Sequence, residues 1–193
     1  MNSYYGKNSS LLSKLFIHQF GLAVFGVLLY SAAAVSGNKA LTVGFSIFSA
    51  AFYLFLLYVL MWESGASDKI RIDGGRMKKD GFKGLKVTLL ANIPNYFFAV
   101  ISSVAYLCID KSILDASGNF TTPVWALNIY AIAQTVGFYI NSMYAGIADS
   151  LGVATAPLWL FVLTVPSLAV CGLGYWLGTK ELFGLPSSSP NRD

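Results

Sequence analysis

Residues 40–62 read ALTVGFSIFSAAFYLFLLYVLMW, a run of 23 residues without a charged side chain. A helix needs about 20 predominantly apolar residues to cross a hydrocarbon core of about 30 Å. A spanning β-strand needs only about 9–11 residues and alternates apolar with polar side chains. The second half of the run, residues 52–62, has no such alternation. The run therefore predicts a transmembrane helix and argues against a barrel.

The same absence of charge recurs along the chain, in which only 11% of the residues are charged and 55% are hydrophobic. A soluble domain has about 25% charged residues, so the composition excludes a water-soluble globule. Four further charge-free stretches cover residues 15–38, 87–109, 116–148 and 150–179. We therefore expect an all-α polytopic membrane bundle of five helices, at about residues 15–36, 41–62, 87–109, 124–147 and 156–178. Four or six crossings are the alternatives, because a re-entrant fourth or fifth segment would change the count.

We expect one transmembrane domain over residues 1–185 and a disordered tail over residues 186–193, which is rich in serine and proline. The first apolar run is longer than the about 7–15 residues of a signal peptide, and a second run follows closely. It is therefore expected to be a retained helix.

The distribution of Lys and Arg predicts an orientation, because short cytoplasmic loops carry an excess of positive charge. Seven of the 13 basic residues lie between residues 63 and 86, and they are Lys69, Arg71, Arg76, Lys78, Lys79, Lys83 and Lys86. This loop and the N-terminus are expected on the cytoplasmic side, and five crossings would leave the C-terminal tail outside. Trp62 and Trp159 then fall at cytoplasmic ends, and Trp125 and Trp176 at outer ends, as interfacial indole rings do. The expected location is a plasma membrane, the cytoplasmic membrane of a bacterium.

Three interpretations of the basic loop compete. It could be an anchor against anionic lipid headgroups, a docking surface for a cytoplasmic partner, or a phosphate cradle. The cradle has the least support because neither Gly-x-x-x-x-Gly-Lys-Ser/Thr nor Gly-x-Gly-x-x-Gly occurs. Nucleic acid is not an expected partner, since acidic residues interrupt the basic ones. Residues 70–77 alternate around Asp73-Gly74-Gly75, which predicts a small β-hairpin.

The sequence offers little chemistry for catalysis. His18 is the only histidine, and Cys108 and Cys171 are the only cysteines, so no zinc-type cluster of His and Cys can form. No Asp, Glu, Lys or Arg falls inside an expected span, whereas proton-coupled pumps need ionisable groups there. We expect neither an enzyme nor a metal or cofactor. His18 is expected at the membrane interface, and the two cysteines are expected to stay unpaired because their depths differ.

Neutral amides lie at membrane depth instead. Asn92 and Asn95 open the third expected helix, and Gln134 and Asn141 share one face of the fourth because they are seven residues apart. Together with the region of Pro166 they could line a cavity for a small neutral solute. The alternative is that they form hydrogen bonds between helices, each contributing about 0.6 kcal/mol.

Small residues at four-residue spacing predict close helix contacts within the bundle. They are Gly174 and Gly178 in the fifth helix, and Ala133 with Gly137 and Ser142 with Gly146 in the fourth.

Two functions remain open. The first is a non-catalytic membrane subunit or assembly partner of a larger complex, such as a transport complex, with other membrane subunits as its partners. The second is a small self-oligomerising transporter, channel-like protein or binder of a neutral solute. In size and apolar content the chain resembles the substrate-binding S components of energy-coupling-factor vitamin transporters. Those carry six helices as a rule, no residue motif matches them, and no residue role is carried over.

Overall fold

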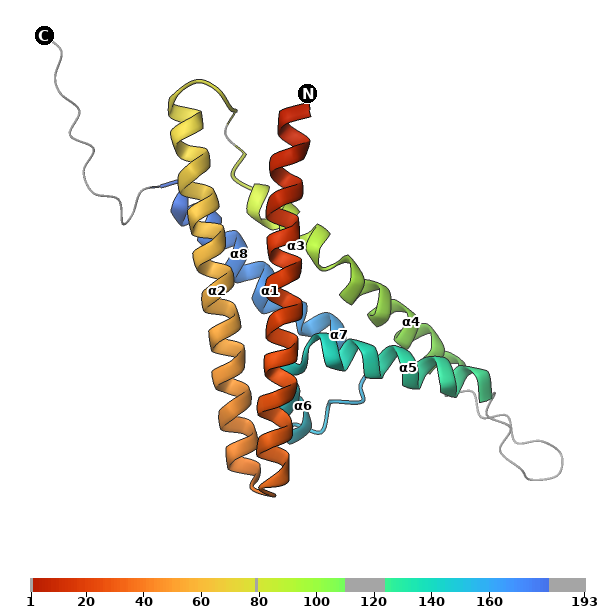
Figure 1. The fold of residues 1–193 in the computed structure, drawn as a ribbon. Coiled ribbons are helices and arrows are strands. Elements are labelled where there is room, and N and C mark those ends of the chain that lie inside the picture. Colours follow the sequence, from red (N-terminus) through yellow and green to blue (C-terminus); the bar gives the residue numbers. More distant parts are fainter. Residues whose placement is uncertain (1, 79, 110–123, 181–193) are drawn as a thin grey trace, which may run out of the picture.

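The computed structural model describes residues 2–78, 80–109 and 124–180, with side chains from residue 9 onward. Every regular element within these residues is helical, which confirms the all-α prediction (Figure 1). Lys79 and the expected tail 186–193 lie outside the described residues.

The two longest helices form an antiparallel hairpin (Figure 1). α1 spans Asn2–Val35 and α2 spans Lys39–Asp73. At the turn between them Gly37 has a φ of 63°, a conformation that glycine adopts without steric cost. The side chain of Asn38 accepts a hydrogen bond from the Ala40 N–H at 3.0 Å and so caps the first turn of α2.

α2 continues well beyond the expected end at residue 62, and the predicted β-hairpin over residues 70–77 is wrong. The sequence Asp73-Gly74-Gly75 ends the helix instead of turning a hairpin. Gly75 has a φ of 68°, its N–H donates to the Ile72 carbonyl at 3.0 Å, and the Arg76 N–H donates to the Arg71 carbonyl at 2.9 Å. This is the Schellman motif, in which a glycine in the left-handed conformation satisfies the last helical carbonyls. The pair Gly74-Gly75 therefore ends α2.

The third expected helix is broken in two. α3 spans Lys83–Ala91 and α4 spans Ile93–Ile109, with a bend of 54° between them. Pro94 lies just after the bend. A proline has no N–H for the carbonyl four residues earlier, and its ring displaces that carbonyl, so a bend at this point is expected.

The fourth expected helix, residues 124–147, ends early. α5 spans Val124–Ile140 and is followed by a 3₁₀ turn, η1, over Ser142–Tyr144 and by α6 over Ala145–Ser150. Neighbouring helices bind the turn: the Ser142 hydroxyl donates to the Ala23 carbonyl at 2.5 Å, and the Ser46 hydroxyl donates to the Met143 carbonyl at 2.9 Å. These contacts fasten the irregular backbone to α1 and α2.

The fifth expected helix consists of α7, Trp159–Val162, and α8, Thr164–Gly178, which together make one apolar run of 20 residues. Pro166 lies in the first turn of α8, where its missing N–H would otherwise pair with the carbonyl of Val162. The last residue of α7 is therefore Val162.

Within the described residues, three helices are long and apolar enough to cross a membrane: Ser9–Val35, Lys39–Asp73 and Trp159–Gly178. The bent pair α3–α4 would make a fourth if it counts as one span, and α5, with 17 described residues, is a shorter apolar helix that is not counted among them. The count is therefore three or four, fewer than the five expected from charge alone.

α2 and α8 run in the same direction. In the expected arrangement of five alternating crossings, these two helices would run in opposite directions. A Cβ built on Gly174 would meet the carbonyl oxygen of Tyr58 at 2.9 Å, and one built on Gly178 would meet that of Trp62, four residues further along α2. A step of four residues along α8 therefore corresponds to a step of four residues in the same direction along α2. The end of α8 lies beside the last third of α2 (Figure 1). The small-residue contact predicted at Gly174 and Gly178 is present.

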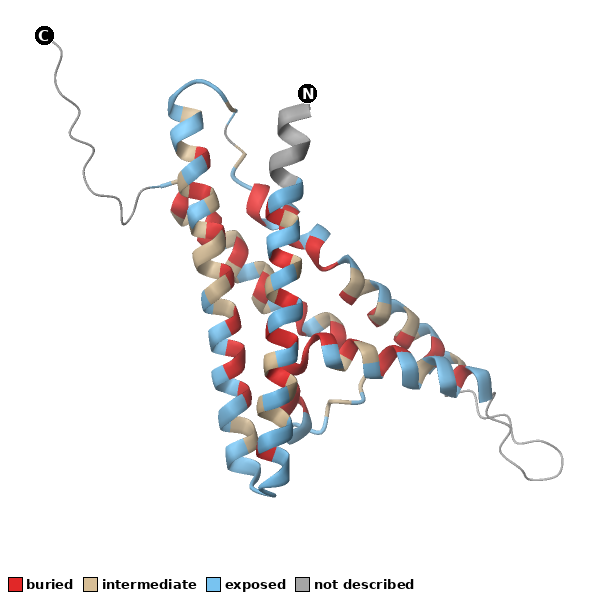
Figure 2. Ribbon diagram, in the orientation of Figure 1, coloured by how far each residue is buried: buried red, intermediate tan, exposed pale blue. Residues whose placement is uncertain are grey.

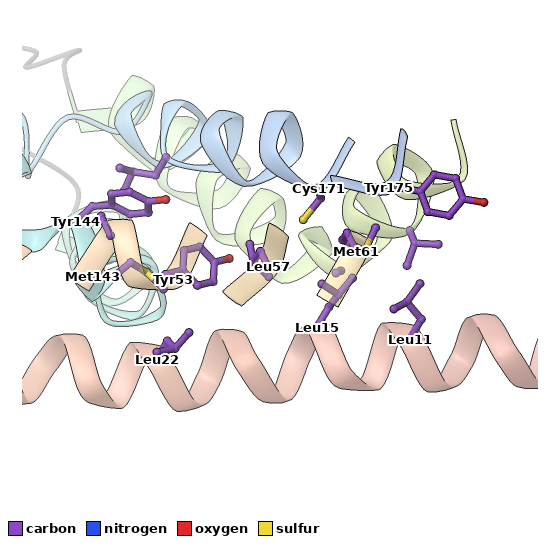
Figure 3. Close-up of a cluster of buried hydrophobic side chains, with 14 residues drawn as sticks. Leu11, Leu15, Leu22, Tyr53, Leu57, Met61, Met143, Tyr144, Cys171 and Tyr175 are labelled. Atoms are coloured by element: carbon purple, nitrogen blue, oxygen red, sulfur yellow. The ribbon is translucent and has the colours of Figure 1, made fainter. Parts of the chain in front are cut away.

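Buried residues line the sides of α1, α2 and α8 that face one another, while the outer helix faces are exposed (Figure 2) and largely apolar. In Figure 3, Leu11, Leu15 and Leu22 point from α1 toward α2. Met61 of α2 and Cys171 of α8 are fully buried. Exposed apolar faces of this extent suit a chain surrounded by lipid or by other membrane helices.

Candidate functional site

Three of the four amides predicted to bind a solute form one hydrogen-bonded chain in the interior. Asn95 Nδ2 donates to Asn92 Oδ1 at 2.9 Å, and Asn141 Nδ2 donates to Asn95 Oδ1 at 3.1 Å. All three residues are buried. The chain ties the bend before α4 to the end of α5, so it joins the two places where expected helices break.

The free ends of this chain bond to the backbone. Asn92 Nδ2 donates to the Thr88 carbonyl at 2.9 Å, and Asn141 Nδ2 donates to the Gly137 carbonyl at 2.9 Å. Each carbonyl lies four residues before the amide that binds it. The amide groups of Asn92, Asn95 and Asn141 are thus engaged with the protein itself, in the manner of hydrogen bonds that hold helices together in lipid.

Gln134 lies apart from these three residues. It accepts a hydrogen bond from the Ser102 hydroxyl at 2.8 Å and donates to the Ala154 carbonyl at 3.1 Å. Nearby, the Tyr130 hydroxyl donates to the Thr155 carbonyl. These contacts attach α4 and the segment before α7 to α5. The structure therefore brings Asn92, Asn95 and Asn141 together but gives Gln134 a separate position, and Pro166 is half-buried in the first turn of α8.

The basic residues predicted to contact headgroups or a partner occupy different environments. Four of them are exposed, and these are Arg71, Arg76, Lys78 and Lys86. Lys69 is half-buried and pairs with Asp73 at 3.0 Å, four residues along α2. Lys83 is only 3% exposed and faces the interior, so it is not placed to touch a headgroup.

Lys83 belongs to a buried polar cluster that was not predicted from the sequence. Its Nζ lies 2.6 Å from Asp68 Oδ2, and the Tyr175 hydroxyl donates to the same oxygen at 3.1 Å. Asp68 is fully buried. The cluster thus joins α2, α3 and α8 through one carboxylate. Removing one member of a buried ion pair costs about 3–5 kcal/mol, because the other charge is left without compensation.

A periodic signal for Asp68 was present in the sequence. The buried face of α2 carries Leu57, Met61, Gly65 and Asp68, spaced four, four and three residues apart as on one side of a helix. Asp68 continues this stripe. Residues 63–86 were expected to form a loop, and helical spacing has no meaning in a loop.

The connection before α3 has its own ion pair. Asp80 accepts from Lys86 Nζ at 2.9 Å and from the Phe82 N–H at 3.1 Å. The hydrogen bond from Lys86, helped by that from the Phe82 N–H, lowers the pKa of the Asp80 carboxyl below its usual value. Both hydrogen bonds favour the ionised form and hold the chain in place where α3 begins.

The remaining reactive groups are isolated. His18 is half-buried, and its Nδ1 lies 2.7 Å from the carbonyl oxygen of Lys14 in the preceding turn. Cys108 and Cys171 are both unpaired. Among the described residues, no group of three or more His, Cys, Asp or Glu side chains is close enough to hold a metal ion.

Comparison with known proteins found no matching family model, no matching curated protein and no matching solved structure.

Proposed function

We propose that this protein is a non-catalytic membrane subunit, which serves as an assembly partner within a larger membrane complex such as a transport complex. The observation that carries the proposal is the outer face of α5. This face is exposed and carries two polar residues, Asn128 and Thr135, among large apolar ones, whereas the buried side of α5 packs on α4 and α1.

The outer face of α5 has the spacing of a helix–helix seam. Val124, Leu127, Ile129 and Ala131 are exposed as well, but one stripe of the exposed face runs the length of the helix with alternating steps of three and four positions. Its residues are Trp125, Asn128, Ile132, Thr135 and Tyr139. The three large side chains are between 54% and 63% exposed. Alternating steps of three and four residues keep one stripe of a helix against a partner helix over several turns.

We infer that α5, an apolar helix packed beside the crossings, lies at the depth of the hydrocarbon core, and there Asn128 favours a protein partner over lipid. An amide that faces hydrocarbon has no water to bond with, and its transfer without a hydrogen-bond partner costs about 2–7 kcal/mol. A neighbouring helix can supply a backbone or side-chain partner, and polar side chains are a common means of joining membrane helices. Thr135, two turns away on the same face, offers a second hydroxyl contact.

The parallel packing of α2 and α8 supports a particular orientation for the subunit. With α1, α2, α3–α4 and α7–α8 as four crossings, the N-terminus, the loop 74–82 and the end of α8 share one face. The basic residues then concentrate there, including Lys180, which five crossings would put on the opposite side. That concentration favours the cytoplasm for this face. Anionic lipid headgroups on that side would contact the exposed basic residues Arg71, Arg76, Lys78 and Lys86.

The experiment that tests the subunit proposal is gentle extraction of the tagged protein from its native membrane, followed by mass spectrometry of what copurifies. A discrete partner at fixed stoichiometry is expected. In a variant without native cysteines, Ile132→Cys should crosslink to that partner. Asn128→Leu should weaken the association, and the control Ser31→Leu, on an exposed face of α1, should leave it unchanged. A homo-oligomer would instead give crosslinks between two copies through Ile132→Cys.

A second candidate function is the binding or passage of a small neutral solute, on the grounds that Asn92, Asn95, Gln134 and Asn141 are all buried amides. Their hydrogen bonds to the protein favour the first candidate. Gln134→Leu together with Asn141→Leu would abolish solute uptake or solute-induced stabilisation under the second candidate, and would leave copurification intact.

A further inference from the structure

A polar groove lies between α1 and α2 near the end of the hairpin that holds the N-terminus. Its volume is about 250 Å³, and it is lined by Ser10, Leu11, Lys14, Leu60, Glu63, Ser64 and Ser67. The two charges come from opposite walls, Lys14 from α1 and Glu63 from α2. The groove thus offers a cation, an anion and three hydroxyl groups within a small space.

The groove lies at the boundary of the apolar part of the hairpin. Lys14 is the last charged residue before the charge-free residues 15–38, and Glu63 is the first after the charge-free residues 40–62. Charges that flank a spanning segment lie at the level of the lipid headgroups. Leu60 lies one turn toward the apolar side of Glu63 and continues the groove into the hydrocarbon region. A ligand of this groove therefore needs a charged end at the interface and an apolar end below it.

The pair of opposite charges selects among such ligands. We propose that the groove binds the headgroup of phosphatidylethanolamine from the surrounding bilayer. Its phosphate lies against Lys14 and the hydroxyls of Ser10 and Ser64, and its ammonium group donates to Glu63. Hydrogen bonds between charged partners of this kind are about twice as strong as neutral ones. The groove is smaller than the about 300–1,000 Å³ of pockets for drug-sized ligands, as befits a headgroup whose chains remain in the membrane.

The other common phospholipids fit less well. Phosphatidylcholine carries a quaternary ammonium group without an N–H to donate to Glu63. Phosphatidylglycerol carries no cation, so its net negative charge would lie beside the carboxylate of Glu63 without compensation. The groove is therefore expected to discriminate between headgroups of similar size.

The test is native mass spectrometry of the purified full-length protein in detergent, titrated in turn with the three phospholipids with matched acyl chains. We expect one bound phosphatidylethanolamine, with at least tenfold weaker retention of the other two. Lys14→Gln and Glu63→Gln should each weaken phosphatidylethanolamine binding about tenfold. The controls Lys39→Gln and Asp149→Asn, which change exposed charges outside the groove, should stay within twofold of the unaltered protein.

Because Lys14 and Glu63 are both exposed, their variants are expected to fold, and thermal unfolding of each variant verifies this. Equal retention of the three lipids would overturn the proposal. So would groove variants that bind like the two controls. A final titration uses soluble O-phosphoethanolamine, the headgroup without its acyl chains. If this compound binds 1:1 and phosphatidylethanolamine does not, the ligand is a free zwitterion and the assignment to a lipid is wrong.

Discussion

Lys83 Nζ lies 2.6 Å from Asp68 Oδ2, in a position where the two side chains are only 4% and 0% exposed. The contact fixes the first residue of α3 against α2 and so closes the connection between them. The Tyr175 hydroxyl, 3.1 Å from the same carboxylate oxygen, adds α8 to the junction. The three helices are thus fastened together at the end of the molecule where the exposed basic residues gather.

Breaking this junction should destabilise the protein strongly. Asp68→Asn and Lys83→Met should each lower the free energy of unfolding by about 3–5 kcal/mol, because each leaves a buried charge without its partner. The double variant Asp68→Asn/Lys83→Met should lose less than the sum of the two. Denaturant unfolding of the detergent-solubilised protein measures all three.

The exposed pair Asp80–Lys86 provides the matched control for the junction. Its distance of 2.9 Å is similar, but the Lys86 side chain is 65% exposed. Lys86→Met should therefore change the free energy of unfolding by no more than about 1 kcal/mol. Equal effects of Lys83→Met and Lys86→Met would show that the buried pair does not hold the junction.

The close contact of α2 with α8 makes a second prediction. Gly178→Ala should destabilise the protein by about 1–3 kcal/mol, since the added methyl group meets the backbone of Trp62 and Ala66, which cannot move as a side chain can. Gly21→Ala in α1 is the control, because nothing lies within 4 Å of the position of its new Cβ. Alanine is the better helix former, so this control should be neutral or stabilising by up to about 1 kcal/mol. Thermal unfolding that ranks the two variants in the opposite order would contradict the packing.

The sequence predicted the parts of this fold that depend on composition and local spacing. The absence of charge located the apolar helices α1 and α2, and the four-residue spacing of Gly174 and Gly178 located a helix contact. The sequence did not predict the relative direction of α2 and α8. A charge-free window such as residues 116–148 is long enough for a crossing, yet it contains Asn141, where α5 stops and the backbone turns.

The site was predictable in the same limited sense. Residue type identified Asn95, Gln134 and Asn141 as buried polar groups, but their partners depend on which helices meet, and that is decided by packing over the whole chain. The pairing of Asp68 with Lys83 joins residues fifteen apart through a Schellman turn. Such a pairing is invisible when the intervening residues are assumed to be a loop.

The amide chain gives a third prediction. Asn141→Leu removes the donor that Asn95 Oδ1 accepts from, and it leaves that buried oxygen without this partner. The free energy of unfolding should fall by about 1–3 kcal/mol, the usual cost of an unsatisfied buried polar group. Asn128→Leu is the control because Asn128 is exposed on α5, and in the isolated subunit it should have little effect. If Asn141→Leu is as stable as the control, the hydrogen bonds between these amides do not hold α4 and α5 together.

The parallel arrangement of α2 and α8 leads to a prediction about the membrane itself. With four crossings, Asn38 lies on the outer side, and Lys78 and Lys180, all three of them exposed, lie on the cytoplasmic side. In a background in which Cys108 and Cys171 are replaced by alanine, an impermeant maleimide should label Asn38→Cys in intact cells. It should label Lys78→Cys and Lys180→Cys only after the membrane is permeabilised. Five alternating crossings would expose Lys180→Cys in intact cells, so labelling there would rule out the four-crossing arrangement even if Asn38→Cys and Lys78→Cys react as expected.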